Sequence, residues 1–196
     1  MNSLCEFLYL FERINCFCVY CVYIEKIFII LMQKLSVYID TNIIFDFFLN
    51  LSKSFRNEQE LELPRKLVFL IGQQEKQNIK LLTSILTQAE ISRRLKSEYG
   101  FHSKDIEEFW LTFINISGTD MIEEIEIDWK ELLRITTEVP LKKRVTNLQH
   151  LMIAKHYNMW FLTGDKEIFG KLKKFYDKII SYTELRKLIE SKHTSL

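Results

Sequence analysis

The chain has no cysteine after Cys21 and is also poor in glycine and proline. Its 196 residues include four cysteines, all within the first 21 positions, together with five glycines and two prolines. A secreted domain held by disulfides would spread cysteines through its core, so the main body is typical of a cytoplasmic protein. The low glycine and proline content argues against collagen-like sequence, repeat arrays and long disordered linkers.

The sequence also lacks a strong net charge. It carries 27 basic and 26 acidic residues, for a formal net charge of +1. No global field favours nucleic acid, so any basic binding surface must be local. Apolar residues make up 47% of the chain and charged residues 27%, which is typical of a globular core. The length suits one domain, or one domain with an appendage.

Residues 1–31 are apolar and contain every cysteine, but they lack a long uninterrupted hydrophobic run. Five charges interrupt the segment: Glu6, Glu12, Arg13, Glu25 and Lys26. A membrane-spanning helix needs roughly 18 or more apolar residues, and a signal peptide needs a basic start and a cleavage site, so neither pattern fits. Cys16, Cys18 and Cys21 lack the paired spacing of a zinc site and have no nearby histidine.

We expect residues 1–31 to be an extension upstream of the true start of translation. Met32 stands just before the first strong strand signal, so residues 32–196 are predicted to form the domain. Two alternatives remain for the extension, a metal site at its cysteines and a peripheral membrane anchor. We expect no membrane contact unless residues 1–31 are translated and anchor the protein.

Acidic residues follow three predicted strands. Residues 37–39 are β-branched or aromatic and are followed by Asp40 and a helical pattern. Residues 79–87 form a second strand signal that runs into a helix containing Glu90, and residues 159–162 form a third that leads to Asp165. Since the carboxyl ends of parallel strands meet at one edge of a sheet, these three acids are expected there together.

The remaining pattern alternates helices with short strands and predicts an α/β fold with a mainly parallel sheet of about four to five strands. The expected helices cover residues 58–77, 103–115, 129–138, 141–157, 167–175 and 182–191. Residues 50–57 are polar and are predicted to form a loop. Residues 121–127 alternate apolar and acidic side chains, as in an edge strand, and residues 178–180 form a further core strand.

Three clustered carboxylates repel one another unless a positive charge compensates them. Oxygen ligands on rigid elements are what Mg²⁺ or Mn²⁺ prefers, and no Cys or His stands at these three positions to favour zinc. A second interpretation of each acid is a helix cap.

Several segments together resemble the PIN-domain ribonucleases, the family that includes the toxins of VapBC toxin–antitoxin modules. The resemblance lies in residues 38–42, 87–90, 147–154, 161–166 and 179–185, and it extends over about residues 32–190. It implies a three-layer α/β/α PIN-like fold. One position departs from the family pattern, because Asn147 stands where a further acid is usual. An amide oxygen can still bind a metal or a water, but it adds no negative charge.

The resemblance implies a divalent-metal-dependent endoribonuclease that hydrolyses RNA phosphodiester bonds with Mg²⁺ or Mn²⁺. Asp40, Glu90 and Asp165 would hold the metal, and Asn147 would orient a water or the substrate. Asn42 and Thr163 would support the carboxylates by hydrogen bonds, whereas Thr41 is predicted to be a helix cap. Because Asn147 replaces an acid, the alternative is a catalytically weakened PIN module that binds RNA or another protein.

Four basic residues are candidate contacts for RNA phosphates: Arg93, Arg94, Arg144 and Lys166. Arg93 and Arg94 share a helix face with Glu90, so a surface ion pair is an equally good interpretation of that cluster. The resemblance further implies RNA as substrate, a homodimer and, for a toxin, an antitoxin protein as partner.

Overall fold

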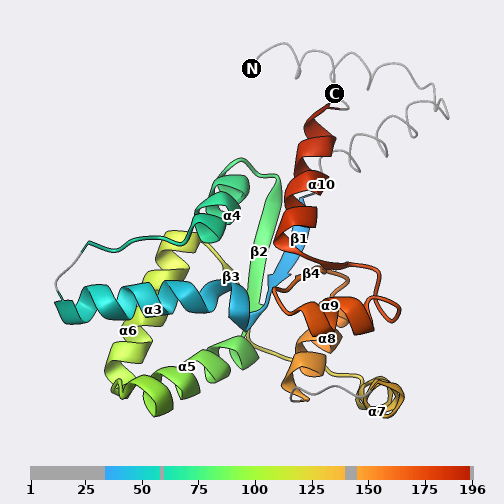
Figure 1. The fold of residues 1–196 in the computed structure, drawn as a ribbon, viewed down its shortest axis with the longest axis horizontal. Coiled ribbons are helices and arrows are strands. Elements are labelled where there is room, and N and C mark those ends of the chain that lie inside the picture. The colour runs from blue at the N-terminus through green and yellow to red at the C-terminus, as the bar shows by residue number, and fades with distance from the viewer. Residues whose placement is uncertain (1–33, 58–59, 140–144, 195–196) are drawn as a thin grey trace, which may run out of the picture. The chain divides into compact units, whose positions relative to one another are not determined.

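The computed structural model describes residues 34–57, 60–139 and 145–194, and it contains a five-stranded sheet in which all strands are parallel. The strands are β1 (Leu35–Ile39), β2 (Ile79–Ser84), β3 (Asp120–Ile122), β4 (Trp160–Leu162) and β5 (Ile179–Ile180). Their order across the sheet is β3-β2-β1-β4-β5, so β1 is the central strand (Figure 1). The predicted parallel sheet is confirmed, with β3 at one edge.

Eight helices cover this sheet within the described residues. They are α3 (Thr41–Asn57), α4 (Arg65–Glu75), α5 (Ile85–Tyr99), α6 (Ser103–Ser117), α7 (Trp129–Glu138), α8 (Thr146–His156), α9 (Lys166–Leu172) and α10 (Tyr182–Thr194). The loop predicted at residues 50–57 is wrong, because α3 continues through it. Leu51 packs against the core there, and Phe55 stacks edge-on against Phe109 of α6 with ring centroids 5.5 Å apart.

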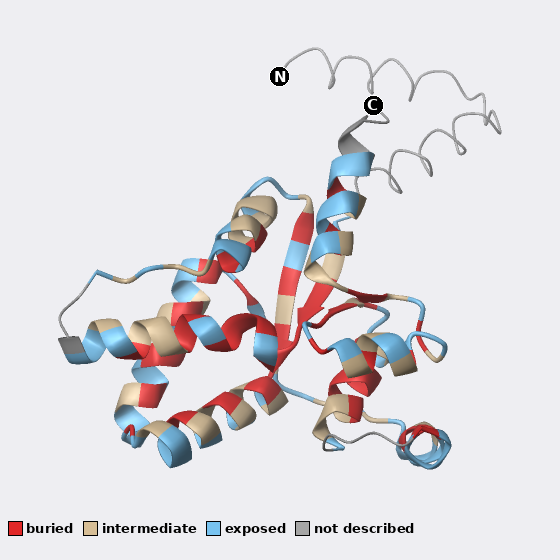
Figure 2. Cartoon of the chain, in the orientation of Figure 1, coloured by how far each residue is buried: buried red, intermediate tan, exposed pale blue. Residues whose placement is uncertain are grey.

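The side chains of each strand alternate between two hydrophobic clusters, one on each face of the sheet. Val37 and Ile39 of β1 pack with α3, α4, α5, α6 and α10, whereas Tyr38 between them packs with α7, α8 and α9. The same alternation separates Leu162 from Phe161 in β4. Buried residues line the strands in Figure 2. The fold is therefore a three-layer α/β/α arrangement of the PIN-like type, as expected.

The central strands bring distant residues together at the carboxyl edge of the sheet. In the register of β1 with β4, Ile39 lies opposite Leu162, so Asp40 and Thr163 follow side by side. The Asp40 amide donates to the Leu162 carbonyl at 3.0 Å, which extends the pairing by one residue. Helix α3 begins directly after Asp40, so the chain turns at this edge with no intervening loop.

None of the helices in the described ranges is long and apolar enough to cross a membrane. Residues 1–31, the predicted upstream extension, lie outside the described residues. The expected start of the domain at Met32 is therefore still a prediction.

Candidate functional site

Asp40 is a buried carboxylate, 3% exposed, at the end of the central strand. Its Oδ2 accepts hydrogen bonds from Thr163 Oγ1 and Asn42 Nδ2, both at 2.7 Å. Asn42 is held in turn, because its Oδ1 accepts from the Gly164 amide at 2.9 Å. These contacts connect the end of β1 with the loop after β4 and fix the orientation of the Asp40 carboxylate.

The surroundings of Asp40 favour its neutral form. Burial is the largest influence and raises the pKa of its carboxyl group, and the negative charge of Glu90 raises it further. His150 and the hydrogen bond from Thr163 act in the opposite direction but do not restore the ordinary value. A nearby cation would reverse this balance, because opposite charge stabilises the ionised carboxylate.

Glu90 approaches the same region from a helix and not from a strand end. The predicted strand over residues 79–87 is too long, because β2 ends at Ser84 and α5 begins at Ile85. Glu90 therefore lies in the second turn of this helix and not at its start. Its Oε2 accepts from Thr41 Oγ1 and pairs with His150 Nε2 at 3.0 Å. Burial alone would raise the pKa of Glu90, but the bonds from His150 and Thr41 hold it below the usual range.

A chain of buried polar groups supports Glu90 from behind. His150 is fully buried, and its Nδ1 lies 2.6 Å from the Tyr38 hydroxyl, which lies 2.6 Å from Ser84 Oγ. An ionised Glu90 can only accept, so Nε2 of His150 carries a proton and donates to it. The Tyr38 hydroxyl joins Nδ1 of His150 to Ser84 Oγ, so every member of the chain has a partner and the imidazole is held in one orientation.

Asp165 follows β4 but has a different local role. Its Oδ1 accepts from the amides of Glu167 at 2.8 Å and Ile168 at 3.4 Å, so it caps α9. Its own amide donates to Thr163 Oγ1 at 3.1 Å, and the same hydroxyl donates to Asp40. Thr163 therefore couples the two strand ends, although Oδ1 of Asp165 is bonded to a helix N-terminus.

Asn147 lies in the first turn of α8 and is partly buried. It is one helical turn before His150, so the two residues share a face of the helix. Helix α8 leads into β4 through a short turn and thus begins at the carboxyl edge of the sheet, on the side of Asp40. Within the described ranges, the Asn147 side chain makes no hydrogen bond to Asp40, Glu90 or Asp165.

The four candidate phosphate contacts are in different situations. Arg93 is exposed on α5 and lowers the pKa of Glu90 through its charge. Arg94 is used structurally, because its guanidinium carbon lies 3.5 Å from the centroid of the Phe45 ring and its Nε lies 3.5 Å from Glu98. Lys166 lines a pocket of about 280 Å³ beside Thr163 and Asp165. Arg144 lies outside the described residues.

The structure brings Asp40 and Glu90 into one electrostatically coupled network, with His150 beside them. Within the part of the chain that is described, no group of three or more His, Cys, Asp or Glu side chains is placed to hold a metal ion. Two carboxylates are nevertheless sufficient protein ligands for Mg²⁺, which keeps several waters and binds substrate phosphates. The donor set of Asp40 and Glu90 therefore fits a hard divalent cation.

The sequence predicted no site role for two residues of the network, Tyr38 and His150, and it predicted a capping role for a third, Thr41. Tyr38 and His150 were known only as parts of motifs, and Thr41 was predicted to be a cap although its hydroxyl donates to Glu90. The spacing of His150 from Asn147, one turn along the same helix face, was the available signal. No such signal connects Tyr38 to His150, because their hydrogen bond joins segments 112 residues apart.

Comparisons with known proteins do not add to these observations. No family model matches the chain, and a search of curated proteins gives no match either.

Proposed function

We propose that the protein is a divalent-metal-dependent endoribonuclease of the PIN-domain type. The observation that carries this proposal is Asp40, a buried carboxylate whose pKa is raised by burial and by a second acid, at the carboxyl edge of a parallel sheet. Open α/β folds bind their ligands at this edge. A carboxylate with a strongly perturbed pKa and a specific charged neighbour is a candidate functional group.

Asp40 and Glu90 would hold the Mg²⁺ or Mn²⁺ ion, and Asp165 would add negative charge from the neighbouring strand end. The bound ion supplies a Lewis acid and a water of lowered pKa for attack on the phosphodiester. Thr163 and Asn42 orient Asp40, while Thr41 and His150 orient Glu90. Asn147, at the start of α8, would contact a water or the RNA.

The test is Mn²⁺-dependent cleavage of a labelled single-stranded RNA. We expect Asp40→Asn to reduce the rate by more than about 100-fold, since even residues that only support a metal ligand cost about 10- to 100-fold. Asp46→Asn is the matched control, because Asp46 is an exposed acid on the same helix, α3. Cleavage that survives EDTA, or that Asp40→Asn leaves unchanged, would refute the metal-site proposal.

A second candidate function is a PIN module that binds RNA or another protein without cleaving. It is favoured by Asn147, which adds no charge, and by the two-carboxylate donor set. Retention of RNA without Mn²⁺-dependent cleavage, under conditions where a known metal-dependent ribonuclease is active, would select this alternative.

Three further features of the proposal rest on the resemblance and on composition. We propose a cytoplasmic location from the absence of cysteine in residues 22–196, and a homodimer from the resemblance to the PIN-domain ribonucleases. For a toxin, a small gene immediately upstream that encodes a DNA-binding antitoxin is the expected observation. Size-exclusion chromatography with light scattering tests the dimer.

A further inference from the structure

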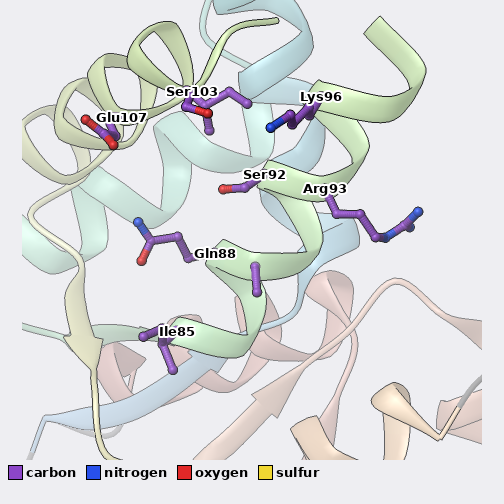
Figure 3. A pocket seen from close by; sticks show the side chains of 9 residues that line it. Ile85, Gln88, Ser92, Arg93, Lys96, Ser103 and Glu107 are labelled. Carbon is purple, nitrogen blue, oxygen red and sulfur yellow. The ribbon is translucent and has the colours of Figure 1, made fainter. Parts of the chain in front are cut away.

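A pocket of about 450 Å³ lies between α5 and α6. Helix α5 also carries Glu90 of the candidate metal site. Helix α5 contributes Ile85, Gln88, Ser92 and Lys96, which recur every three or four residues and so form one stripe along the helix. Helix α6 contributes Ser103, Ile106 and Glu107 on the opposite side. Figure 3 shows these two walls, with Lys96 near Ser103 at one end and Ile85 at the other.

The pocket is coupled to the site through Arg93 and the backbone of α5. Ala89, which precedes Glu90, and Arg93, one turn beyond it, both line the pocket. The positive charge of Arg93 also acts on Glu90. A group bound at this end of the pocket would therefore lie within one or two helical turns of the carboxylates.

The chemistry of the lining is mixed, as in sites for small polar molecules. Arg93 and Lys96 are exposed cations, and neither forms an ion pair with a described residue. Ser92, Ser103 and Gln88 offer hydrogen-bonding groups, while Ile85 and Ile106 supply apolar surface. A volume of this size falls within the usual range for small-molecule sites. Phosphate, sugar and base of one nucleotide would use the cations, the polar groups and the apolar surface respectively.

Glu107 sets the direction in which a nucleotide would lie. It is the one acid among the lining residues, and an ionised carboxylate accepts hydrogen bonds but cannot donate them. It repels a phosphate and favours a base edge that carries an amino group, such as the N4 of cytosine. Uracil offers only its ring N3–H, which lies between two carbonyl oxygens that the carboxylate repels, so uracil is the weaker ligand at this end.

We propose that the α5–α6 pocket binds one nucleotide of a single-stranded RNA that flanks the scissile phosphate, with its phosphate at Lys96 and its base toward Glu107. This inference deepens the proposed ribonuclease function and rests on it. Arg93 acts on Glu90 through its charge, and Ala89 precedes Glu90 in the chain. No other lining residue has a side-chain hydrogen bond to the Asp40–Glu90 network in the described part of the chain, so the pocket is a binding subsite.

The test measures binding separately from cleavage. Fluorescence anisotropy of a labelled, mixed-sequence single-stranded RNA on the full chain in EDTA gives the dissociation constant at several salt concentrations. We expect Lys96→Ala to weaken binding about three- to tenfold and to reduce the salt slope by about 0.7, the value for one phosphate contact on a single strand. Lys96 is the cleaner choice, because Arg93 also acts on Glu90.

Two control variants decide whether any effect is local. Lys130→Ala removes an exposed cation from α7, and Lys66→Ala removes a cation from the pocket beside Asp165. Neither is expected to change the dissociation constant as much as Lys96→Ala. Equal effects of Lys96→Ala and Lys130→Ala would overturn the pocket proposal.

The base end is tested with Glu107→Gln. The wild-type chain is expected to bind cytosine-rich RNA more tightly than uracil-rich RNA, and the variant to reduce this preference at least threefold. An unchanged preference would overturn the placement of the base. If the wild-type chain cleaves RNA with Mn²⁺ but Lys96→Ala binds RNA normally, the pocket proposal is rejected and the ribonuclease proposal stands. If Lys96→Ala weakens RNA binding but the wild-type chain cleaves no RNA, the ribonuclease proposal is rejected and the pocket still binds RNA.

Discussion

Asp40 and Asp165 follow neighbouring parallel strands, yet the fold uses them differently. Asp40 accepts bonds from side chains, including Thr163, which is 123 residues away in the sequence. Asp165 accepts bonds from the amides of Glu167 and Ile168, immediately after it. The first carboxylate is oriented by tertiary contacts, whereas Oδ1 of the second accepts from its own helix N-terminus, where a negative charge is favourable.

A functional acid and a capping acid at the same type of position differ in the groups that surround their carboxylates. Burial raises the pKa of Asp40, and the neighbouring groups that lower this pKa do not reverse the shift. A capping carboxylate lowers the free energy of the fold, whereas a buried carboxylate beside another acid raises it unless a ligand binds. A buried acid that lowers the stability of the fold when no ligand is bound is consistent with a functional role.

The largest expected effect compares the two aspartates directly in the cleavage assay. Asp40→Asn should lower the rate of RNA cleavage by more than about 100-fold, and Asp165→Asn by only about tenfold, since Asp165 contributes charge and not orientation. Both substitutions keep the side-chain volume. Equal losses in the two variants would break the comparison and give Asp165 a direct place in the metal site.

The next effect concerns the support of Glu90. His150→Ala removes the donor to Glu90 and the partner of Tyr38, so cleavage should fall about 10- to 100-fold and the pKa of Glu90 should rise. His156→Ala is the control, because His156 is exposed on the same helix. Carboxyl resonances followed by nuclear magnetic resonance report the pKa. If Glu90 titrates normally in the His150 variant, the imidazole does not orient it.

Adding an acid should sharpen the comparison from the opposite side. Asn147→Asp places a further negative charge at the start of α8, and we expect Mn²⁺ binding to tighten about fivefold. One more charge a few ångströms from a cation is worth about 1 kcal/mol even in water. Isothermal titration calorimetry measures the affinity. No gain would mean that Asn147 does not face the metal.

The capping role of Asp165 predicts a smaller effect on stability. Asp165→Ala should lower the free energy of unfolding by about 1 kcal/mol, whereas Asp165→Asn should stay close to wild type, because asparagine is also a good N-cap. Urea denaturation compares the variants. Identical stabilities of the Ala and Asn variants would exclude the cap as a stabilising contact.

The smallest expected effect is a change of stability with pH. The pKa of Asp40 in the folded protein is raised above its ordinary value of 3.8, so the folded state binds the proton more tightly than the unfolded state. The stabilisation is fully present below the unfolded pKa and is lost as pH rises through the folded pKa. In EDTA, the stability of Asp40→Asn relative to wild type should therefore increase as pH rises through this window.

The same experiment with Mn²⁺ provides the complementary measurement. Near neutral pH, Mn²⁺ should raise the unfolding free energy of the wild-type chain and have a much smaller effect on Asp40→Asn, because only the native site binds it. A stability difference that does not change with pH would contradict the assigned environment of Asp40.

Local patterns were sufficient for most of the fold. Helix α7 matches its predicted range of residues 129–138, and Asp128 caps it by accepting from two backbone amides. β-branched and aromatic runs located β1, β4 and β5. The loop predicted at residues 50–57 shows the limit, because this polar segment is part of a helix whose inner face packs against α6. Tertiary contacts override local polarity in such segments.

The sequence predicted which acidic residues belong to the site better than it predicted how they are arranged in space. Asp40 and its supporting residues Asn42 and Thr163 follow from the positions after β1 and β4, since the parallel register makes them neighbours. Glu90 was selected for a position after a strand, but it reaches the site from within α5.

Local sequence was enough to predict the alternation of strands and helices, the acids that follow the strands and the missing negative charge at Asn147. Those properties depend on residue types within a few positions of one another. Tertiary packing was needed to bring Asp40, Glu90 and His150 into one network, to set Asp165 at a helix cap, and to place Lys96 opposite Ser103 across a pocket. The physical reason is that packing of the helices on the sheet selects which distant side chains meet.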